Sequence, residues 1–586
     1  MPVAEGTGGG VAKWQLALVV GAPVALGLGY MYYKNNVRTS NRSTKPETKP
    51  DRHAKSKENG ASTDKQISID GDVDSNQVPS SAAKQPETPL EEAQRYKKEG
   101  NTYFKIGKYD KAIAQYNMAI EICPVQNVEE MATFYQNRAA AYEQLGKYDS
   151  VKMDCTKAIE LKPRYVKALL RRARASEQMG DLESALEDVT ATCIYEGFSS
   201  QMSLTLADRL LKQLGKQHVQ ENLQNKKFIM PSKHFIKTYM LSFPNDPVFS
   251  RLQLPLPEDI PELYRNLLQA LKDEKYDDII SLCTDAINSL EADATSCKFE
   301  ILLLRATFYL LLGKHSLAFE DLDFIINSED MPKNVKLNAL IKRATLYMQL
   351  EDPEKAVKGF EEAMMMDETY SDIYQHSGQT NLVLNRVDEA KRDFEKAVRY
   401  NPNYSSGHVQ KCYADYRHAT FKRDITALQN AEKCFKETLE KYPDHPEGYM
   451  LYGQIMSESQ DFEKADEYFA KVLELDPLDA NVYVHRGLLQ LQWHGNTSSG
   501  IDRAVEYIHK ALEIDEKCEV GYETLGSIEV QRGNLEEAIK LFDKALELCR
   551  TSLELTHLYS LRNATKTQLI LKRKLGLDIK DVPNVH

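Results

Sequence analysis

Most of the chain carries a repeated pattern of small and aromatic positions at helical spacing. A small residue is followed by an aromatic residue, then by an alanine–aromatic–alanine series, and often by proline. Three copies contain Gly100, Tyr103, Ala112, Tyr116, Ala119 and Pro124; Gly453, Ala465, Phe469 and Pro477; and Gly526, Ala538, Phe542 and Ala545. Small residues let two helices approach closely, aromatic residues fill the gap between them, and proline ends a helix. The pattern therefore predicts stacked pairs of helices.

The period of about 34 residues is similar to that of the tetratricopeptide repeat. We count about eleven repeats and predict an all-α superhelical solenoid behind one N-terminal transmembrane helix. The first three repeats start near Ala93, Ala132 and Val166, and eight more resume near Pro261 after a proline-rich break. A helix at 553–575 would cover the open end of the stack. Such stacks form concave grooves, which favour peptide binding over catalysis.

The N-terminal region has the pattern of a membrane anchor. Trp14 to Tyr33 is twenty residues without a charge, enough for a helix that spans about 30 Å of hydrocarbon. Aromatic residues stand at both of its ends, where membrane interfaces favour them. A cleaved signal peptide is the alternative, but it would have a basic leading region, whereas Lys13 is offset here by Glu5. Basic residues after Tyr33 place the C-terminal part in the cytosol.

Residues 35–88 are polar, and they bury too little apolar surface to offset the entropy of ordering, so we expect a flexible tether. The proline-rich stretch marks a second boundary, between two groups of repeats. The predicted parts are a short tail at 1–13, the anchor at 14–33, the tether at 34–90, a three-repeat domain at 91–200, a helical and proline-rich connector at 201–258, an eight-repeat domain at 259–550, and a capping helix with a tail at 551–586.

Composition narrows the function further. The net charge is −12, although residues 34–60 are basic, and an acidic solenoid argues against nucleic acid as the main partner. The nine cysteines include no Cys-x-x-Cys. Cys155, Cys283 and Cys434 fall at or beside the aromatic position of a second helix, so we interpret them as small core residues in a reducing compartment, not as disulfides or zinc ligands. The sequence has no nucleotide-binding loop, metalloprotease motif or hydrolase motif. We therefore expect no enzyme, no cofactor and no metal site.

Five polar residues in the first three repeats share one predicted surface. Lys97 and Asn101 lie four residues apart on one helix, as do Lys167 and Arg171, and Asn137 stands at the corresponding position between them. Because first helices line the inner surface of such a superhelix, the five side chains should converge in one groove. Cations and amides in this arrangement suit a peptide that ends in carboxylates. Lysine and asparagine are also common on exposed helices, so the signal is the combination of all five.

The late repeats predict a second groove, for client precursors. Its expected inner-face residues are Met450, Leu451, Gln454, Glu458, Val484, His485 and Leu488. They mix apolar, polar and acidic character. Methionine adapts to many sequences, and an acidic group suits the basic side of an amphipathic targeting helix. Ordinary packing between repeats is the alternative for Met450 and Leu488.

The order of anchor, tether, clamp repeats, break and further repeats resembles the seventy-kilodalton receptor of the mitochondrial outer-membrane translocase. The most specific segments are 137–142, 167–172 and 483–493, and the resemblance covers the whole chain. It implies a single-pass receptor of the mitochondrial outer membrane whose bulk faces the cytosol. Such a receptor docks seventy- and ninety-kilodalton heat-shock chaperones by their acidic C-terminal tails. It receives preproteins with internal targeting signals, especially carrier proteins, and passes them to other translocase subunits.

Two other functions stay open at this point. A membrane-tethered co-chaperone would dock heat-shock proteins without receiving a client, and it would need only the first three repeats. A scaffold for folded proteins, on another membrane such as the endoplasmic reticulum, would not need the five-residue clamp. The eight later repeats argue against the first function and the clamp argues against the second.

Overall fold

The computed structural model describes residues 87–253, 260–289, 295–495 and 497–576. Every regular element within these ranges is a helix, so the predicted all-α class is confirmed. None of the described helices is both long and apolar enough to cross a membrane. The expected anchor at 14–33 lies outside the described residues, as does the expected tether up to residue 86.

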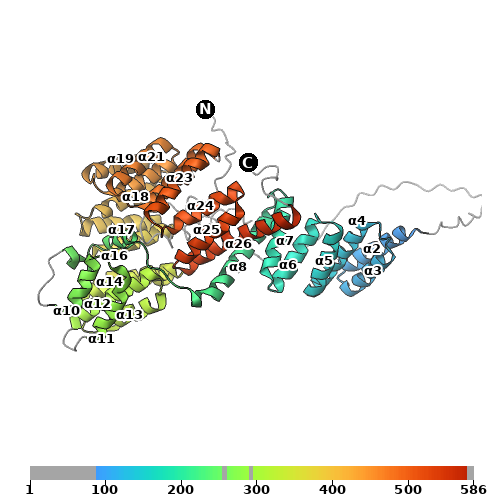
Figure 1. Ribbon diagram of the computed structural model, residues 1–586, viewed down its shortest axis with the longest axis horizontal. Coiled ribbons are helices and arrows are strands. Elements are labelled where there is room, and N and C mark those ends of the chain that lie inside the picture. The colour runs from blue at the N-terminus through green and yellow to red at the C-terminus, as the bar shows by residue number, and fades with distance from the viewer. Residues whose placement is uncertain (1–86, 254–259, 290–294, 496, 577–586) are drawn as a thin grey trace, which may run out of the picture. The chain divides into compact units, whose positions relative to one another are not determined.

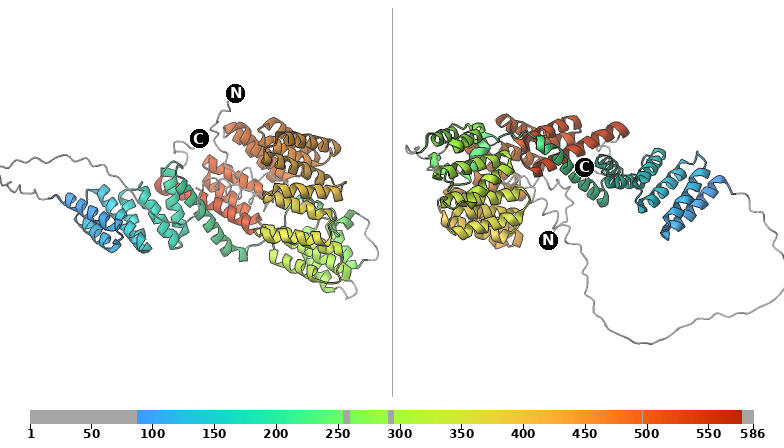
Figure 2. Two further views of the ribbon diagram at one scale, coloured as in Figure 1. Left: turned by 180° about the vertical axis from the view of Figure 1, so that it is seen from behind. Right: turned by 90° about the horizontal axis from the view of Figure 1, so that it is seen from below.

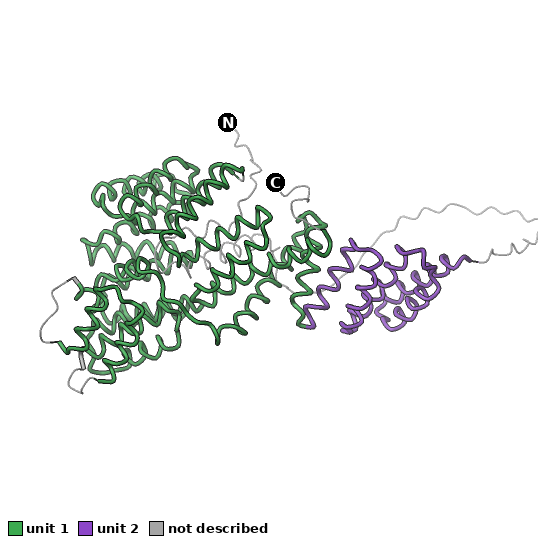
Figure 3. The backbone as a smooth tube through the Cα atoms, in the orientation of Figure 1, with its two compact units in different colours: residues 1–37, 180–586 green, residues 38–179 purple. Residues whose placement is uncertain are grey.

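The smaller of two compact units ends at Met179 and contains five described helices (Figure 3). They are α2 (Pro89–Lys105), α3 (Tyr109–Ile122), α4 (Val128–Gln144), α5 (Tyr148–Leu161) and α6 (Val166–Gln178). Helix α2 packs on α3, and α4 packs on α5. The start of α2 is fixed by a capping box, in which Thr88 and Glu91 each accept the backbone N–H of the other.

The larger unit contains all described helices from α7 onward. They are α7 (Leu182–Tyr195), α8 (Gln201–Asn222), η2 (Leu223–Asn225), α9 (Lys233–Leu241), η3 (Phe249–Gln253), α10 (Glu262–Lys272), η4 (Tyr276–Asp278), α11 (Ile279–Ser289), α12 (Thr295–Leu312), α13 (His315–Asn327), α14 (Lys333–Gln349), α15 (Pro353–Met366), α16 (Ser371–Val383), α17 (Val387–Tyr400), α18 (Ser405–Lys422), α19 (Ile425–Lys441), α20 (Pro446–Glu458), α21 (Phe462–Leu475), α22 (Ala480–His494), α23 (Ser498–Ile514), α24 (Glu519–Arg532), α25 (Leu535–Leu548) and α26 (Ser552–Leu575). From α10 to α25, consecutive helices pack as hairpins that stack side by side (Figures 1 and 2). The eleven predicted repeats correspond to the consecutive helices α2 to α7 and α10 to α25.

The small and aromatic positions of the pattern meet as predicted. A Cβ atom built on Gly100 would lie 2.6 Å from the ring of Tyr116, which is closer than real Cβ atoms approach a neighbour. The same relationship joins Gly378 to Phe394, Gly453 to Phe469, and Gly526 to Phe542. In each pair the glycine lies on the first helix of a repeat and the aromatic residue on the second. Close approach of two helices therefore requires glycine at these positions.

The C-terminal helix α26 covers the last hairpin, as the sequence predicts. It packs on α25, and it also contacts α7 and α8. Leu571 joins a hydrophobic cluster with Ala191 and Ile194 of α7. Sequence reasoning groups α7 with the first three repeats, whereas the contacts of the structure group it with the larger unit.

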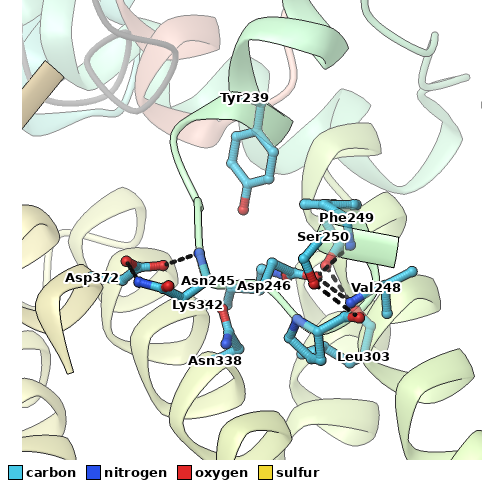
Figure 4. A network of polar contacts seen from close by, with 12 residues as sticks. Tyr239, Asn245, Asp246, Val248, Phe249, Ser250, Leu303, Asn338, Lys342 and Asp372 are labelled. Atoms are coloured by element: carbon cyan, nitrogen blue, oxygen red, sulfur yellow. Dashed lines mark hydrogen bonds and ion pairs between the residues drawn. The ribbon is translucent and has the colours of Figure 1, made fainter. Parts of the chain in front are cut away.

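The connector between the two groups of repeats is fixed by polar contacts, some of them buried (Figure 4). The Asn245 side chain donates to Oδ1 of Asp372 over 2.7 Å, and its backbone N–H donates to Oδ2 over 3.1 Å. Asp246 pairs with Lys342, and each of these side chains is only 1% exposed. Asp246 also accepts the backbone N–H groups of Val248 and of Phe249, the first residue of η3. Burial raises the pKa of Asp372 to about 6. The connector is therefore attached to α14 and α16 as part of the folded unit.

Candidate functional site

The two asparagines of the predicted clamp meet across neighbouring repeats. The Asn137 amide on α4 donates to the Asn101 side-chain oxygen on α2 over 3.3 Å. The same oxygen accepts the hydroxyl of Tyr116 over 2.8 Å. Tyr116 is an aromatic residue of the repeat pattern and is 1% exposed. The packing of the first repeat therefore orients Asn101, which in turn orients Asn137.

Two of the three cationic members contact α4 close to Asn137. The Lys97 ammonium on α2 lies 5.8 Å from the ring centroid of Phe134. Phe134 precedes Asn137 by about one turn of α4. Arg171 on α6 donates through Nη1 to the backbone carbonyl of Gln136 over 3.4 Å. Lys167 lies one turn before Arg171 on the same helix and is exposed to solvent. All five residues lie on α2, α4 and α6, the first helices of their repeats.

One acidic neighbour of the clamp could not be anticipated from the pattern. The Glu143 carboxylate on α4 accepts from Nε of Arg171 over 2.8 Å, and the two side chains are 22% and 18% exposed. The guanidinium thus already holds one carboxylate. Chemically, the arrangement offers two ammonium groups, one guanidinium and an amide pair to an anionic peptide.

A second candidate site is a cavity of about 450 Å³ inside the larger unit. Its wall is formed by the connector helix α9, by α16, by the first turns of α18 and α20, and by α21, α22 and the start of α24. Apolar groups such as Leu241 and Val472 alternate with polar groups such as Glu447 and Asp476. Cavities in this size range hold drug-sized molecules, so this one would receive a few side chains of a longer partner.

Four of the predicted groove residues line this cavity and three do not. Met450, Val484, His485 and Leu488 lie in its wall. Leu451 is completely buried in a cluster with Phe435 and Phe469, so it belongs to the packing between repeats. Gln454 is 1% exposed, and both of its amide atoms are buried without a hydrogen-bond partner. Glu458 pairs with Arg417 of α18 over 3.3 Å.

Several ionisable groups of the cavity wall have shifted pKa values. A hydrogen bond of 2.7 Å joins His234 of α9 to Asp476, which raises the pKa of the histidine and lowers the pKa of the carboxyl group. Burial raises the pKa of Asp479. Burial also lowers the pKa of His485 to about 4, so this ring is neutral at pH 7. The wall therefore holds the hydrogen-bonded pair of His234 and Asp476 and a neutral His485.

Sequence reasoning missed the residues that α9 brings to the cavity, and it missed Glu447 of α20. His234, Phe235 and Leu241 belong to a short helix outside the repeats, where the periodic pattern gives no signal. Glu447 near the start of α20 accepts from Gln410 and from the hydroxyl of Ser406. Only the tertiary arrangement shows that these groups share one wall.

Three potential metal ligands gather elsewhere in the larger unit. Oxygen or sulfur atoms of Glu519, Cys549 and Glu554 lie within 4.8 Å of one another. Glu554 is also the acidic partner of the capping box that starts α26, where its carboxylate accepts the N–H of Thr551. The Cys549 sulfur lies 3.2 Å from Oε1 of the Glu519 carboxyl group and donates to it. Hydrogen bonds within the protein thus account for this cluster.

The hairpins and glycine–aromatic contacts define a tetratricopeptide-repeat protein. A model of the TPR repeat matches residues 100–146. A model of the tetratricopeptide repeat matches residues 132–165, 337–370, 371–404, 446–477 and 521–552.

Relatives that match over nearly the whole length identify the family. Mitochondrial import receptor subunit TOM70 of Rattus norvegicus is 42% identical over 98% of this chain and 94% of its own length. The Homo sapiens protein of the same name is also 42% identical, over 97% of this chain and 94% of its own. The Saccharomyces cerevisiae protein (strain ATCC 204508 / S288c) is 26% identical over 80% of this chain and 79% of its own. The chain belongs to the TOM70 family of mitochondrial import receptor subunits, which confirms the resemblance seen in the sequence. The crystal structure of the yeast Tom70 aligns with a TM-score of 0.48 at 24% identity, over 83% of this chain and 98% of that chain.

Proposed function

We propose that this import receptor subunit docks cytosolic chaperones through the clamp of α2, α4 and α6, and receives preproteins in the cavity of the larger unit. The preproteins are those with internal targeting signals, carrier proteins above all. The single observation that supports the proposal is the contact between Asn101 of α2 and Asn137 of α4. Chance surface residues on two separate helices would not be expected to meet in this way.

The clamp suits the acidic C-terminal tails of seventy- and ninety-kilodalton heat-shock chaperones. Lys97, Lys167 and Arg171 supply positive charge, while the asparagine amides donate or accept hydrogen bonds. Hydrogen bonds to charged groups contribute about 1.5–3 kcal/mol each. A few such bonds give micromolar affinity after the cost of ordering the tail.

Calorimetry with a peptide that ends in Glu-Glu-Val-Asp tests the clamp on the full-length protein. Arg171→Ala should weaken binding by about 10- to 150-fold, because one charge-assisted contact is lost. Lys167→Ala should also weaken binding, without any loss of packing. Lys98→Ala is the matched control, since Lys98 is exposed and adjacent to Lys97 on α2 but outside the clamp. Equal affinity in all four proteins, with unchanged helicity, would reject the clamp.

The cavity suits apolar side chains of a precursor that also carries polar or basic groups. Leu241 offers exposed apolar surface beside the buried Met450 and Leu488, and Glu447 offers a carboxylate. Burial of one large apolar side chain contributes about 1.5–3 kcal/mol. Precursors with hydrophobic carrier segments or basic amphipathic helices are therefore the expected clients.

Leu241 allows the cavity to be tested without damage to the core. It lines the cavity, yet it is 68% exposed. Leu241→Asp should weaken the binding of carrier segments by about tenfold or more, because it places a charge on an apolar wall. Leu478→Asp is the matched control, since Leu478 is 62% exposed and lies outside the wall. If both variants capture precursor like the parent protein, the cavity is not the client site.

The proposal includes an outer-membrane anchor at residues 14–33 with the repeats in the cytosol. Its supports are the uncharged run, the basic residues that follow it, and membership of a mitochondrial receptor family. Protease added to intact mitochondria should release a large soluble fragment by cutting at residues 35–88. Resistance of the repeats to protease until the outer membrane is opened would contradict this orientation.

A further inference from the structure

Two thiols of the larger unit lie in direct contact. Cys412 on α18 and Cys434 on α19 belong to the two helices of one hairpin, and their sulfur atoms are 3.0 Å apart. The Cys412 sulfur also lies 3.3 Å from the hydroxyl oxygen of Thr438. All nine cysteines of the chain are free thiols in this structure. The hairpin alone thus brings together two cysteines that are distant in sequence.

The two sulfurs have different environments. Cys412 is 1% exposed, whereas Cys434 is partly exposed. The hydrogen bond from Cys412 and the nearby ammonium of Lys411 lower the pKa of the Cys434 thiol. Sharing of this hydrogen bond and burial raise the pKa of the Cys412 thiol. A thiolate near a cation is the reactive form of cysteine, so Cys434 is suited to attack and Cys412 to resolve.

A metal site explains the pair less well. Structural zinc normally takes four ligands, and two sulfurs supply half of them. Within the part of the chain that the structure describes, no third histidine, cysteine, aspartate or glutamate ligand atom completes a group with these sulfurs within 4.8 Å. Oxidation requires only the two sulfurs themselves.

We propose that Cys412 and Cys434 form a redox modification site, which a peroxide converts into an intramolecular disulfide. The Cys434 thiolate attacks one peroxide oxygen and the O–O bond breaks. This gives a sulfenic acid on Cys434 and an alcohol, or water from hydrogen peroxide, once the leaving oxygen takes a proton. The Cys412 sulfur then attacks the sulfenic sulfur, the S–O bond breaks, and the hydroxide leaves with the Cys412 proton as water. The two thiols are oxidised and the peroxide is reduced.

The crosslink would act on the hairpin that borders the cavity. Ser405 and Ser406 at the start of α18 lie in the cavity wall. A covalent bond between α18 and α19 restricts local opening of the hairpin, so backbone amides of both helices should exchange hydrogen more slowly after oxidation. Disulfides in proteins of a reducing compartment are usually transient and regulatory, which fits a bond that thiol reductants can reverse.

Peptide mapping of the purified full-length protein tests the site. The reduced protein is freed of reductant, treated with hydrogen peroxide, blocked with N-ethylmaleimide and digested with trypsin without reduction. Cleavage after lysine and arginine isolates peptide 412–417 and peptide 434–436. The expected product is these two peptides joined, lighter by two hydrogen atoms than their sum, and dithiothreitol should separate them.

Three variants make the result specific. Cys412→Ser should remove the joined peptide and leave a sulfenic acid on Cys434 that dimedone traps. Cys434→Ser should remove the joined peptide and leave Cys412 unmodified, because its thiol is buried. Cys297→Ser should change nothing, since Cys297 is similarly part-exposed but lies on α12. The proposal is wrong if the peptides of Cys412 and Cys434 from the folded parent protein carry only separate sulfinic or sulfonic acids. It is also wrong if both cysteines stay unmodified under conditions that oxidise Cys297.

Discussion

Arg171 and Glu143 form an ion pair across neighbouring repeats, with 2.8 Å between Nε of the guanidinium and Oε2 of the carboxylate. Both side chains are largely shielded from water, at 18% and 22% exposure. Solvent screens such a pair less than it screens an exposed one. In the proposed clamp, the Glu143 carboxylate therefore occupies part of the guanidinium that a chaperone tail would bind.

Replacement of Glu143 by glutamine should strengthen tail binding. The neutral amide keeps the shape of the side chain, releases Arg171 and removes a negative charge beside an acidic ligand. We expect affinity for a Glu-Glu-Val-Asp peptide to rise by about two- to tenfold in fluorescence polarisation. Glu129→Gln is the control, because Glu129 is an exposed carboxylate on the same helix that pairs with Lys162. Weaker binding in Glu143→Gln alone would instead show that Glu143 positions Arg171 for the ligand.

The buried pair of Lys342 and Asp246 should be a major determinant of stability in the larger unit. Each charge is 1% exposed, so removal of one partner leaves the other buried and unpaired. We expect Lys342→Met to lower the free energy of unfolding by about 3–5 kcal/mol in denaturant titrations. The double variant with Asp246→Asn should recover part of this loss. Lys355→Met is the control at the exposed pair with Asp352, where a change within about 0.5 kcal/mol is expected.

The hairpins could be predicted from sequence because their signal is local and repeated. Gly100 and Tyr116 meet because the repeat period fixes both positions. The contact between Asn101 and Asn137 follows in the same way, since equivalent positions of adjacent repeats are neighbours. Helical periodicity and the stacking of repeats are thus enough to bring these two residues of the proposed clamp together.

The cavity could not be predicted from the same signal. Helix α20 is buried on nearly all sides, so no apolar stripe distinguishes the face of Met450 from the face of Leu451. The wall that α9 contributes lies far away in sequence, and its position depends on contacts such as those of Asn245 with Asp372. These are long-range contacts between unlike segments, which periodicity does not encode.

The glycine–aromatic contacts predict opposite results at two glycines of neighbouring hairpins. A Cβ atom on Gly453 would lie 2.8 Å from the Phe469 ring, so Gly453→Ala should force the helices apart and lower the free energy of unfolding by about 1–3 kcal/mol. A Cβ atom on Gly407 would meet its nearest neighbour, Tyr404, at an ordinary 3.5 Å. Gly407→Ala should therefore be neutral or stabilising by up to about 1 kcal/mol. Thermal melting followed by circular dichroism separates the two, and equal destabilisation would contradict the packing argument.

Glu519 should make the larger unit less stable at alkaline pH. Burial raises the pKa of Glu519 from 4.5 to about 8, and repulsion from the neighbouring Glu554 carboxylate contributes to this shift. The folded protein therefore keeps a proton that the unfolded chain releases near its ordinary pKa. The stability that this proton supports is fully present below about pH 4.5 and is lost as pH rises through about 8.

Replacement of Glu519 by glutamine should remove this dependence, because the amide stays neutral at every pH. We expect the melting temperature of the parent protein to fall more than that of Glu519→Gln between about pH 5.5 and about pH 8.5. Glu513→Gln is the control, since Glu513 is an exposed carboxylate on α23 that pairs with Lys510. It should follow the parent protein across the same range. Parallel falls in all three proteins would show that Glu519 is already ionised in the folded state.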